Sequence, residues 1–360
     1  MKIAVTGTRG IPNILGGIET QCEELFPRIA AYGHEVVVMR RKSYCNNDNI
    51  TEYKGVTLID IVAPKKKYFE AIIHTFRAIR KAKKLNADIV HIHAIGPALL
   101  TPFARLLGLK VVFTHHGPDY DRDKWGKSAK LMLKFGERIG VKYANEVIVI
   151  SKGINQIIQK KYNRNDASLI YNGVPTPNII KSTRYLEKLG VKSQKYIFAM
   201  GRFVVEKNFH HLIKAFSSLD QNEYQLVLAG DVDFEDDYSS KLKKLAEENN
   251  VVLTGFVKGE KLYSLLSHAS VFVLPSSHEG LPIALLEAMS YQLPVLVSDI
   301  PANLEVGLEV DSYFPVGNES ILAAKLELLM NKRGDKINYP MEKFNWDAIT
   351  EQVIEVYERL

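Results

Sequence analysis

Cysteines and long apolar runs, two features that mark many secreted and membrane proteins, are scarce in this sequence. The 360 residues include two cysteines, Cys22 and Cys45, too few for a disulfide framework or a cysteine metal site. No uninterrupted apolar run approaches the roughly 18 residues that a membrane-spanning helix needs. The opening residues, MKIAVTGTRG, predict a strand and a turn, because their apolar stretch is too short for a signal peptide. We therefore expect a cytoplasmic protein.

The composition is that of a folded protein, but the charge is distributed unevenly. Hydrophobic residues make up 46% and charged residues 24%, and 360 residues suffice for two domains. Residues 1–172 contain 28 Lys and Arg against 15 Asp and Glu, whereas residues 173–360 contain 19 against 26. The opposite net charges of the two halves predict two units with different partners.

Short apolar runs separated by amphipathic segments recur along both halves of the chain. Such runs are typical of parallel strands buried on both faces, and the segments between them supply crossover helices. The predicted strands are KIAVTG, HEVVVMR, DIVHIHA, KVVFTHHG and EVIVIS in the first half, and YIFAMG, YQLVLAG, VVLTGF, VFVLPS and LPVLVSD in the second. This alternation predicts an α/β protein with two doubly wound, Rossmann-like domains.

The segment YNGVPTPNIIKSTRYLEKLGV interrupts the strand–helix alternation and indicates the domain boundary. We predict an N-terminal Rossmann-like domain over residues 1–172 and a C-terminal Rossmann-like domain over residues 173–340. Residues 341–360 are predicted to form a helix that packs back towards the N-terminal domain. The apolar face of this helix carries Trp346, Ile349, Val353 and Val356. Because ligands bind beyond the carboxyl ends of parallel strands, we expect the site in a cleft between two facing sheets.

The first strand is followed by a glycine-containing loop, VTGTRGIPNILGGIET. Its spacing does not match G-x-G-x-x-G, and the next strand ends in arginines where a ribose-binding acid would be expected, which argues against a dinucleotide site. Gly16 and Gly17 precede a predicted helix, whose free N–H groups favour a phosphate or an acceptor hydroxyl. A purely structural turn is the alternative.

Charged residues in the second half suit a diphosphate-containing ligand. Arg202 and Lys207 follow the strand YIFAMG, and their guanidinium fork and compact ammonium match phosphate oxygens. In PSSHEGLPIALLE, Glu279 precedes a helix that begins near Pro282, and Glu287 lies in the second turn of that helix. About 12 Å would separate the two carboxylates on a continuous helix, too far for an acid–base pair. They suit two hydroxyl groups of one extended ligand; capping and solvation are the alternative roles.

The motifs GRFVVEKN, GFV, PSSHEGLPIALLEAM and YQLPVLVSD together resemble the retaining glycosyltransferases of family 4, which have the GT-B fold of two Rossmann-like domains facing across a cleft. The N-terminal GTRGIPNILGGIET and THHGPDYDRDKWG are similar to rhamnosyltransferase-like bacterial members that build surface polysaccharides. The resemblance covers nearly the whole chain, and it implies that residues 1–172 form the acceptor domain and residues 173–340 the nucleotide-sugar donor domain. It implies a hexosyltransferase that uses a nucleotide-sugar donor and a lipid-linked acceptor, needs no metal or other cofactor, and retains the anomeric configuration.

The resemblance also implies roles for individual residues. Arg202 and Lys207 would bind the donor diphosphate, and Glu287 would bind the ribose. Glu279 would hold the transferred sugar, and His116 would contact that sugar near the reacting carbon. His116, Arg202, Lys207 and Glu279 are therefore the predicted catalytic residues. The other predicted donor-binding residues are Gly16, Gly17, Asn172, Phe256, Val257, Ser276, Gly280, Leu281, Pro282 and Ile283.

Residues after the HHG motif are weaker candidates for binding the acceptor. Aromatic faces suit sugar rings and cationic groups suit phosphate, although the same residues fit the start of a solvated helix. These candidates are Tyr120, Arg122, Lys124 and Trp125. Residues 64–85 alternate apolar and basic side chains at helical spacing, which fits either an anionic membrane surface or a helix packed on its own core. No nucleic-acid-binding module is recognisable, so we expect no nucleic-acid partner.

Two possible metal sites and two other functions remain as alternatives. Asp231 and Asp233 form a D-x-D pair, and His91 and His93 lie on one strand face, but a third ligand is not evident for the histidines. We expect these histidines to face the cleft. A nucleotide-sugar epimerase or hydrolase of the same fold would turn over without an acceptor. A non-catalytic nucleotide-sugar-binding scaffold is disfavoured by the intact set of Arg202, Lys207 and the two glutamates.

Overall fold

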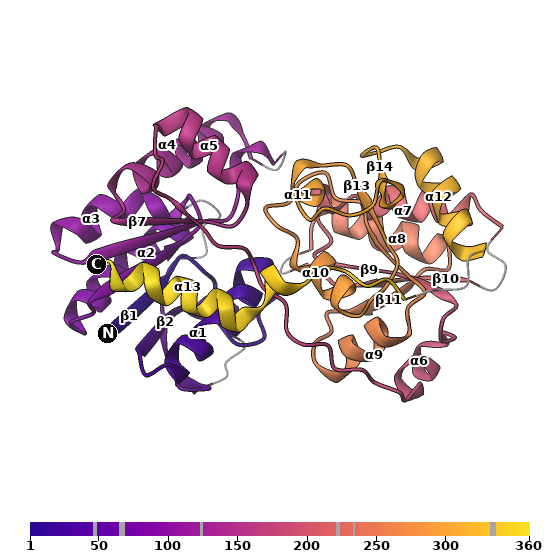
Figure 1. The fold of residues 1–360 in the computed structure, drawn as a ribbon, viewed down its shortest axis with the longest axis horizontal. Helices are drawn as coiled ribbons and strands as arrows, with labels where there is room; N and C mark the ends of the chain where they lie inside the picture. Colours follow the sequence, from indigo (N-terminus) through magenta and orange to yellow (C-terminus); the bar gives the residue numbers. More distant parts are fainter. Residues whose placement is uncertain (46–48, 65–68, 123–124, 221–223, 233–234, 332–335) are drawn as a thin grey trace. The chain divides into compact units, whose positions relative to one another are not determined.

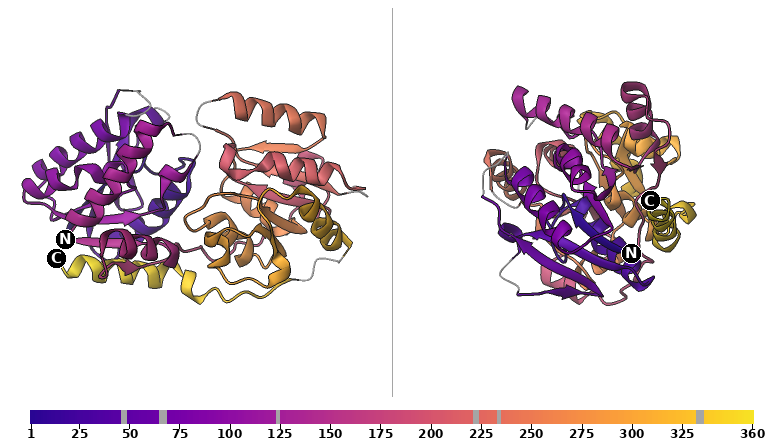
Figure 2. Two further views of the ribbon diagram at one scale, coloured as in Figure 1. Left: turned by 90° about the horizontal axis from the view of Figure 1, so that it is seen from above. Right: turned by 90° about the vertical axis from the view of Figure 1, so that its left-hand side faces the viewer.

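The computed structural model describes residues 1–45, 49–64, 69–122, 125–220, 224–232, 235–331 and 336–360. The chain divides into two compact units, Met1–Gly173 with Asn345–Leu360, and Val174–Phe344. Each unit is built on one sheet with helices on both faces, as two further views also show (Figures 1 and 2). The predicted α/β class with two Rossmann-like sheets is therefore confirmed.

The first unit contains an eight-stranded sheet with the order β3-β4-β2-β1-β5-β6-β7-β8. All neighbouring strands are parallel except β3, which pairs with β4 in the antiparallel sense. The strands are β1 Lys2–Thr6, β2 Glu35–Arg41, β3 Glu52–Tyr53, β4 Val56–Ile61, β5 Ile89–His93, β6 Lys110–His115, β7 Glu146–Val149 and β8 Ser168–Leu169. Strands β2 and β4 lie on one side of β1, and strands β5 to β8 follow in sequence on its other side. The direction in which successive strands are added thus reverses at β1, which is the doubly wound arrangement.

The helices of the first unit include the last helix of the chain. They are α1 Gly17–Ala31, α2 Glu70–Lys84, α3 Thr101–Leu106, α4 Lys127–Tyr143, α5 Lys152–Tyr162 and α13 Trp346–Glu358. Single turns of 3-10 helix occur at Lys42–Tyr44, Pro97–Leu100 and Asp119–Asp121. The apolar face of α13 packs beside α1 in the core of this unit, and the two termini lie close together (Figures 1 and 2).

The second unit contains a six-stranded, fully parallel sheet with the order β11-β10-β9-β12-β13-β14. Its strands are β9 Tyr196–Met200, β10 Gln225–Ala229, β11 Val252–Gly255, β12 Val271–Leu274, β13 Val295–Ser298 and β14 Tyr313–Phe314. Its helices are α6 Arg184–Leu189, α7 Phe209–Ser217, α8 Asp237–Glu248, α9 Glu260–His268, α10 Ile283–Ser290, α11 Pro301–Leu304 and α12 Glu319–Asn331, with 3-10 turns at Val205–Lys207, Val310–Ser312 and Glu342–Phe344.

All ten predicted strands are present. Nine of them are largely buried apolar runs, and β11 is half-buried at the edge of its sheet. The structure adds four strands that the sequence pattern did not indicate. Three of them, β3, β8 and β14, are only two residues long, and β4 has a mixed pattern of buried and exposed residues. In the described parts of the chain, no helix has the length and apolar character needed to cross a membrane.

Candidate functional site

In the second unit, most of the predicted donor-binding residues follow the carboxyl ends of three strands. Arg202 and Lys207 follow β9, Phe256 and Val257 follow β11, and the segment 276–283 follows β12. Because β9 and β12 are adjacent and parallel, their carboxyl ends open at the same edge of the sheet. The fold therefore gathers residues that are far apart in the sequence.

An ion pair joins the loops after β9 and β12. Lys207 Nζ lies 2.5 Å from Glu279 Oε1, and both side chains are mostly buried. The same two loops are joined by hydrogen bonds from Ser277 N to the Glu206 carbonyl at 2.9 Å, and from Asn208 Nδ2 to the Pro275 carbonyl at 3.1 Å. These contacts hold the ammonium and the carboxylate in fixed positions at the sheet edge, as a pre-formed polar site requires.

Helix α10 begins directly after this ion pair. Pro282 is its N-cap residue and Ile283 its first residue, so Glu287 lies in the second turn, as predicted. The N–H groups around Gly280 and Ile283 lie at the N-terminus of a helix, where an anion is favoured. Leu281, Pro282 and Ile283 are buried, so their side chains do not offer a surface to a ligand.

Two other predicted donor-binding positions differ in exposure. Phe256 is exposed and therefore accessible to a nucleotide base, whereas Val257 is buried. Ser276 is fully buried, and its carbonyl accepts a hydrogen bond from the Ser298 hydroxyl at 2.5 Å. Its hydroxyl has no hydrogen-bond partner among the described residues. The main chain of Ser276 is thus fixed by the neighbouring strand β13.

In the first unit, Gly16 and Gly17 stand where the β1–α1 loop enters the helix. The loop is held by Glu19, whose carboxylate accepts hydrogen bonds from the Arg9 main-chain N–H at 3.0 Å and the Thr8 hydroxyl at 3.2 Å. Arg9 also forms an ion pair with Glu19 at 3.0 Å. Gly16 has a φ of 147°, and a Cβ there would collide with both partners of that ion pair. Position 16 therefore requires glycine.

The predicted catalytic His116 belongs to a stacked histidine cluster. His116 Nε2 lies 2.9 Å from His93 Nδ1, and the His93 ring stacks on His91 with centroids 4.3 Å apart. His91 is held between the Tyr357 hydroxyl and the Thr114 hydroxyl, each at 2.6 Å. His91 and His93 are thus buried inside the first unit, and the expectation that they face a cleft is wrong. His116 alone of the three is partly exposed.

The neighbouring His115 points inwards and hydrogen-bonds to Glu137 at 2.8 Å. Glu137 is fully buried and also accepts hydrogen bonds from Tyr120 and Tyr162. Burial raises the pKa of Glu137, but the bonds from His115 and Tyr162 and the nearby charge of Lys161 outweigh burial and leave the pKa lowered. The carboxylate is therefore ionised at neutral pH and holds this cluster together.

Burial of Tyr120 requires a correction to the predicted acceptor site. Only 3% of Tyr120 is exposed, its hydroxyl bonds to Glu137, and Lys161 Nζ contacts the same hydroxyl at 2.6 Å. An acceptor sugar cannot stack on a ring that is already covered, so this predicted contact is not compatible with the structure. Arg122 and Trp125 are partly exposed, and Arg122 forms an ion pair with Asp119 at 3.0 Å. Lys124 lies outside the described residues.

Comparisons with known proteins match both halves of the chain. Residues 15–177 match the family described as Glycosyltransferase Family 4, and residues 182–344 match Glycosyl transferases group 1. Sucrose-phosphate synthase from Thermosynechococcus elongatus has a similar structure, with a TM-score of 0.83 and 20% identity, covering 99% of this chain and 98% of that one. The chain is a glycosyltransferase with the GT-B fold.

Two further similar proteins are described together with a ligand or a substrate. The structure of Anabaena Alr3699/HepE in complex with UDP-glucose has a TM-score of 0.82 to this glycosyltransferase, at 17% identity over the full length of both chains. The Escherichia coli UDP-Gal:alpha-D-GlcNAc-diphosphoundecaprenol alpha-1,3-galactosyltransferase is 30% identical over 251 residues, which are 66% of this chain and 63% of that protein.

The predicted site residues of this glycosyltransferase fall into two groups. Arg202, Lys207 and the segment 276–287 belong to the second unit, whereas Gly16, Gly17, His116 and Asn172 belong to the first. Asn172 is buried, one residue before the chain passes from the first unit to the second after Gly173. Sequence reasoning missed the Arg9–Glu19 ion pair and the role of His93 as a partner of His116. No local motif marks these contacts, because their members meet only through the packing of separate strands and loops.

Asp231 and Asp233 form the D-x-D pair that the sequence offered as a possible metal site. Asp231 forms an ion pair with Lys243 at 3.1 Å, and Asp233 lies outside the described residues. Within the described ranges, no group of three or more His, Cys, Asp and Glu side chains is arranged to hold a metal ion. Metal independence is therefore tested together with donor binding below.

The buried histidines make the free energy of unfolding depend on pH. Burial and the neighbouring His116 lower the pKa of His91 to about 3, whereas an unfolded histidine titrates near 6.5. Below pH 6.5 the unfolded chain binds a proton that the folded protein does not, so the stabilisation is complete above this pH and is lost as the pH falls towards 3. At pH 5 the loss from His91 is about 2 kcal/mol.

Urea unfolding near pH 7.5 and pH 5 measures this effect. The free energy of unfolding should change less between these two pH values for His91→Gln than for the unmodified protein. Glutamine keeps a neutral polar side chain at the position. The same pH dependence in the variant and in the unmodified protein would show that His91 does not contribute.

Proposed function

We propose that this glycosyltransferase moves a sugar, with retention of anomeric configuration, from a nucleotide-sugar to a lipid-linked acceptor during the synthesis of a surface polysaccharide. The observation that carries the proposal is the Lys207–Glu279 ion pair, whose lysine lies in the same loop after β9 as Arg202. Such an arrangement offers cations to a diphosphate and a carboxylate to sugar hydroxyls. The UDP-glucose held by Anabaena HepE and the lipid diphosphate substrate named for the Escherichia coli relative support this assignment.

In the proposed reaction, the bond between the anomeric carbon and the diphosphate breaks while an acceptor oxygen bonds to that carbon from the same face. The acceptor proton passes to the leaving phosphate oxygen. Arg202 and Lys207 stabilise the negative charge that develops there. Lys207 has three N–H donors, and its bond to Glu279 leaves donors for the phosphate. Because these cations neutralise the diphosphate, no metal is required. His116 contacts the transferred sugar, and Glu287 binds the ribose.

We place the reaction at the cytoplasmic face of the plasma membrane. Helix α4 supports this location, because one of its faces combines exposed apolar and basic side chains, a pattern typical of interfacial helices. Leu131 and Phe135 are 71% and 54% exposed and lie one turn apart. The basic residues along the same face are Lys127, Lys134, Arg138 and Lys142. Residues 65–68 of the predicted basic segment lie outside the described residues.

Calorimetric titration tests the donor site directly. UDP-, GDP-, dTDP- and ADP-sugars, including rhamnose among the sugars, are titrated with EDTA present into the unmodified protein and Glu287→Ala. We expect one nucleotide to bind, and the substitution to weaken it about 10-fold to 100-fold, because a hydrogen bond to a charged group is lost. Glu248→Ala, on the exposed face of α8, is the matched control.

Each other outcome changes the proposal. If Glu287→Ala binds the donor as tightly as Glu248→Ala does, Glu287 does not contact the donor. Binding abolished by EDTA would contradict metal independence. With the donor identified, NMR of the product decides between retention and inversion, and donor consumption without acceptor would favour the epimerase or hydrolase alternative.

A further inference from the structure

His93 is a fully buried histidine at the end of β5 that is bonded to the predicted catalytic His116. Its Nδ1 lies 2.9 Å from Nε2 of His116, which directly follows β6, and the two rings are 23° from parallel. Strands β5 and β6 are adjacent and parallel, so both histidines stand at the same edge of the sheet. A nitrogen–nitrogen distance this short indicates a hydrogen bond between the two rings.

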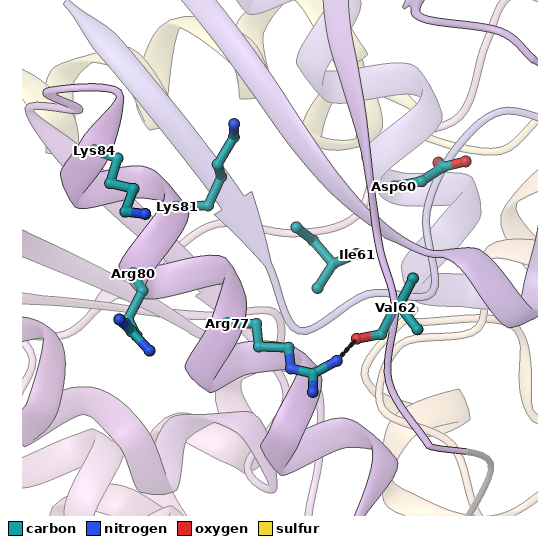
Figure 3. A pocket seen from close by; sticks show the side chains of 7 residues that line it. All are labelled: Asp60, Ile61, Val62, Arg77, Arg80, Lys81 and Lys84. Atoms are coloured by element: carbon teal, nitrogen blue, oxygen red, sulfur yellow. Dashed lines mark hydrogen bonds between the residues drawn. The ribbon is translucent and has the colours of Figure 1, made fainter.

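The surroundings of His93 keep it away from any ligand. Its ring stacks on His91, with centroids 4.3 Å apart, and meets Phe26 edge-on with centroids 5.6 Å apart. A pocket of about 340 Å³ in this unit lies between the end of β4 and α2, and no histidine lines it (Figure 3). His93 is therefore not accessible to a ligand and can act only through His116.

Both histidines are neutral at physiological pH. Burial lowers the pKa of His116 to about 4, and it lowers the pKa of His93 well below the usual value of a histidine. A neutral imidazole has one N–H and one lone pair. The bond between the rings therefore contains one proton, either on Nδ1 of His93 or on Nε2 of His116. In the first case Nδ1 of His116 is a donor, and in the second case it is an acceptor.

The thiol of Cys22 favours the first arrangement. Its sulfur lies 4.0 Å from Nε2 of His93, the other nitrogen of that ring. Burial raises the pKa of Cys22 well above its usual value, so the sulfur keeps its proton. An N–H of His93 at this place would meet a weak acceptor at a long distance, whereas a lone pair there accepts the S–H. Because a buried N–H without a good acceptor is unfavourable, the proton of His93 belongs on Nδ1.

The main chain around both histidines is fixed independently of the bond between them. His115 Nδ1 accepts a hydrogen bond from the Gly117 N–H at 3.0 Å, and its Nε2 bonds to Glu137 at 2.8 Å. A Cβ added at Gly7 would lie 2.1 Å from the His93 carbonyl oxygen, so the residue after β1 packs tightly against His93. The bond from His93 thus has one property of His116 left to determine, which is the orientation and tautomer of its ring.

We propose that His93 is a positioning residue that keeps the proton of His116 on Nδ1, so that His116 presents an N–H donor to an oxygen of the transferred sugar. This inference rests on the proposed function for the identity of the ligand. The tautomer is a property of the protein alone and can be measured with neither donor nor acceptor present. Failure of the transferase proposal and failure of this inference are therefore distinguishable.

Three variants of the full chain test the inference. His93→Leu removes the bond to His116 and keeps a buried apolar side chain. His93→Asn places an amide group as far from the main chain as Nδ1, and its N–H can donate to His116 in the same direction. His91→Gln is the matched control, because it alters a buried histidine that stacks on His93 but hydrogen-bonds to Tyr357 and Thr114.

Nitrogen-15 NMR of the histidine rings in the free protein at neutral pH measures the tautomer. We expect the proton of His116 on Nδ1 in the unmodified protein, in His93→Asn and in His91→Gln. In His93→Leu we expect a mixture of both tautomers, because the partner that selects one of them is gone. A proton on Nε2 of His116 in the unmodified protein would overturn the inference, as would a single unchanged tautomer in His93→Leu.

Calorimetry and kinetics separate the positioning of His116 from a general loss of structure. His116 is proposed to contact the sugar and not the nucleotide. His93→Leu should therefore weaken the intact donor about 10-fold and leave the affinity for the nucleoside diphosphate unchanged. Its kcat should fall about 10-fold to 100-fold, since a small displacement of a positioned group can have an effect of this size. His93→Asn should recover most of both losses, and His91→Gln should show neither. Equal weakening of donor and nucleoside diphosphate by His93→Leu would contradict the positioning role, because it indicates disturbed packing.

Discussion

Replacing Lys207 by glutamine is expected to lower kcat about 100-fold to 1000-fold, the typical effect of removing one preorganised group that stabilises developing charge. The ammonium is held 2.5 Å from Glu279 and mostly buried, so water cannot readily replace it. Glutamine retains N–H donors but not the charge. The measurement is the initial rate of nucleoside diphosphate release with the donor found by calorimetry and an acceptor lipid fraction.

The control for this substitution is Lys244→Gln, which removes the same charge from the exposed surface of α8. Thermal unfolding of both variants shows whether either one loses its fold. Donor binding by Lys207→Gln should fall less than its rate, because the charge on the diphosphate increases in the transition state. A rate close to that of the unmodified enzyme would remove Lys207 from the catalytic residues.

Trp346→Ala is expected to reduce the free energy of unfolding of the first unit by about 3–5 kcal/mol. Trp346 begins α13 and is fully buried in the core that α13 shares with the first sheet. It packs directly against Gly173, where an added Cβ would lie 2.5 Å from Trp346 Cδ2. Alanine would leave a cavity between α13 and the main chain at Gly173.

Urea unfolding followed by circular dichroism measures this loss. Trp346→Phe is the matched control, because the indole N–H is buried and has no partner among the described residues. Phenylalanine thus removes no hydrogen bond and fills most of the volume, so its loss should be clearly smaller than that of alanine. Equal stability of the alanine variant and the unmodified protein would show that α13 does not depend on this contact.

Sequence reasoning succeeded where a local pattern had a single physical cause. Nine of the ten predicted strands are largely buried apolar runs, and Pro282 correctly indicated where α10 begins. It failed where exposure depends on distant residues. Tyr120 was predicted to bind an acceptor, because an aromatic face suits a sugar ring, but the residue is buried and its hydroxyl contacts Glu137 and Lys161. His91 and His93 were expected to face a cleft, but both are buried, and His91 hydrogen-bonds to Tyr357 of the last helix.

The sequence by itself determined the α/β class, most of the strands and the glycosyltransferase motifs, because periodicity and short motifs are local properties of the chain. Only the tertiary structure decided which side chains meet. Lys207 and Glu279 are 72 positions apart, and His93 and His116 are 23 apart. Their contacts exist because parallel strands open their carboxyl ends at one edge of a sheet, and strand order is fixed by packing and not by any short segment.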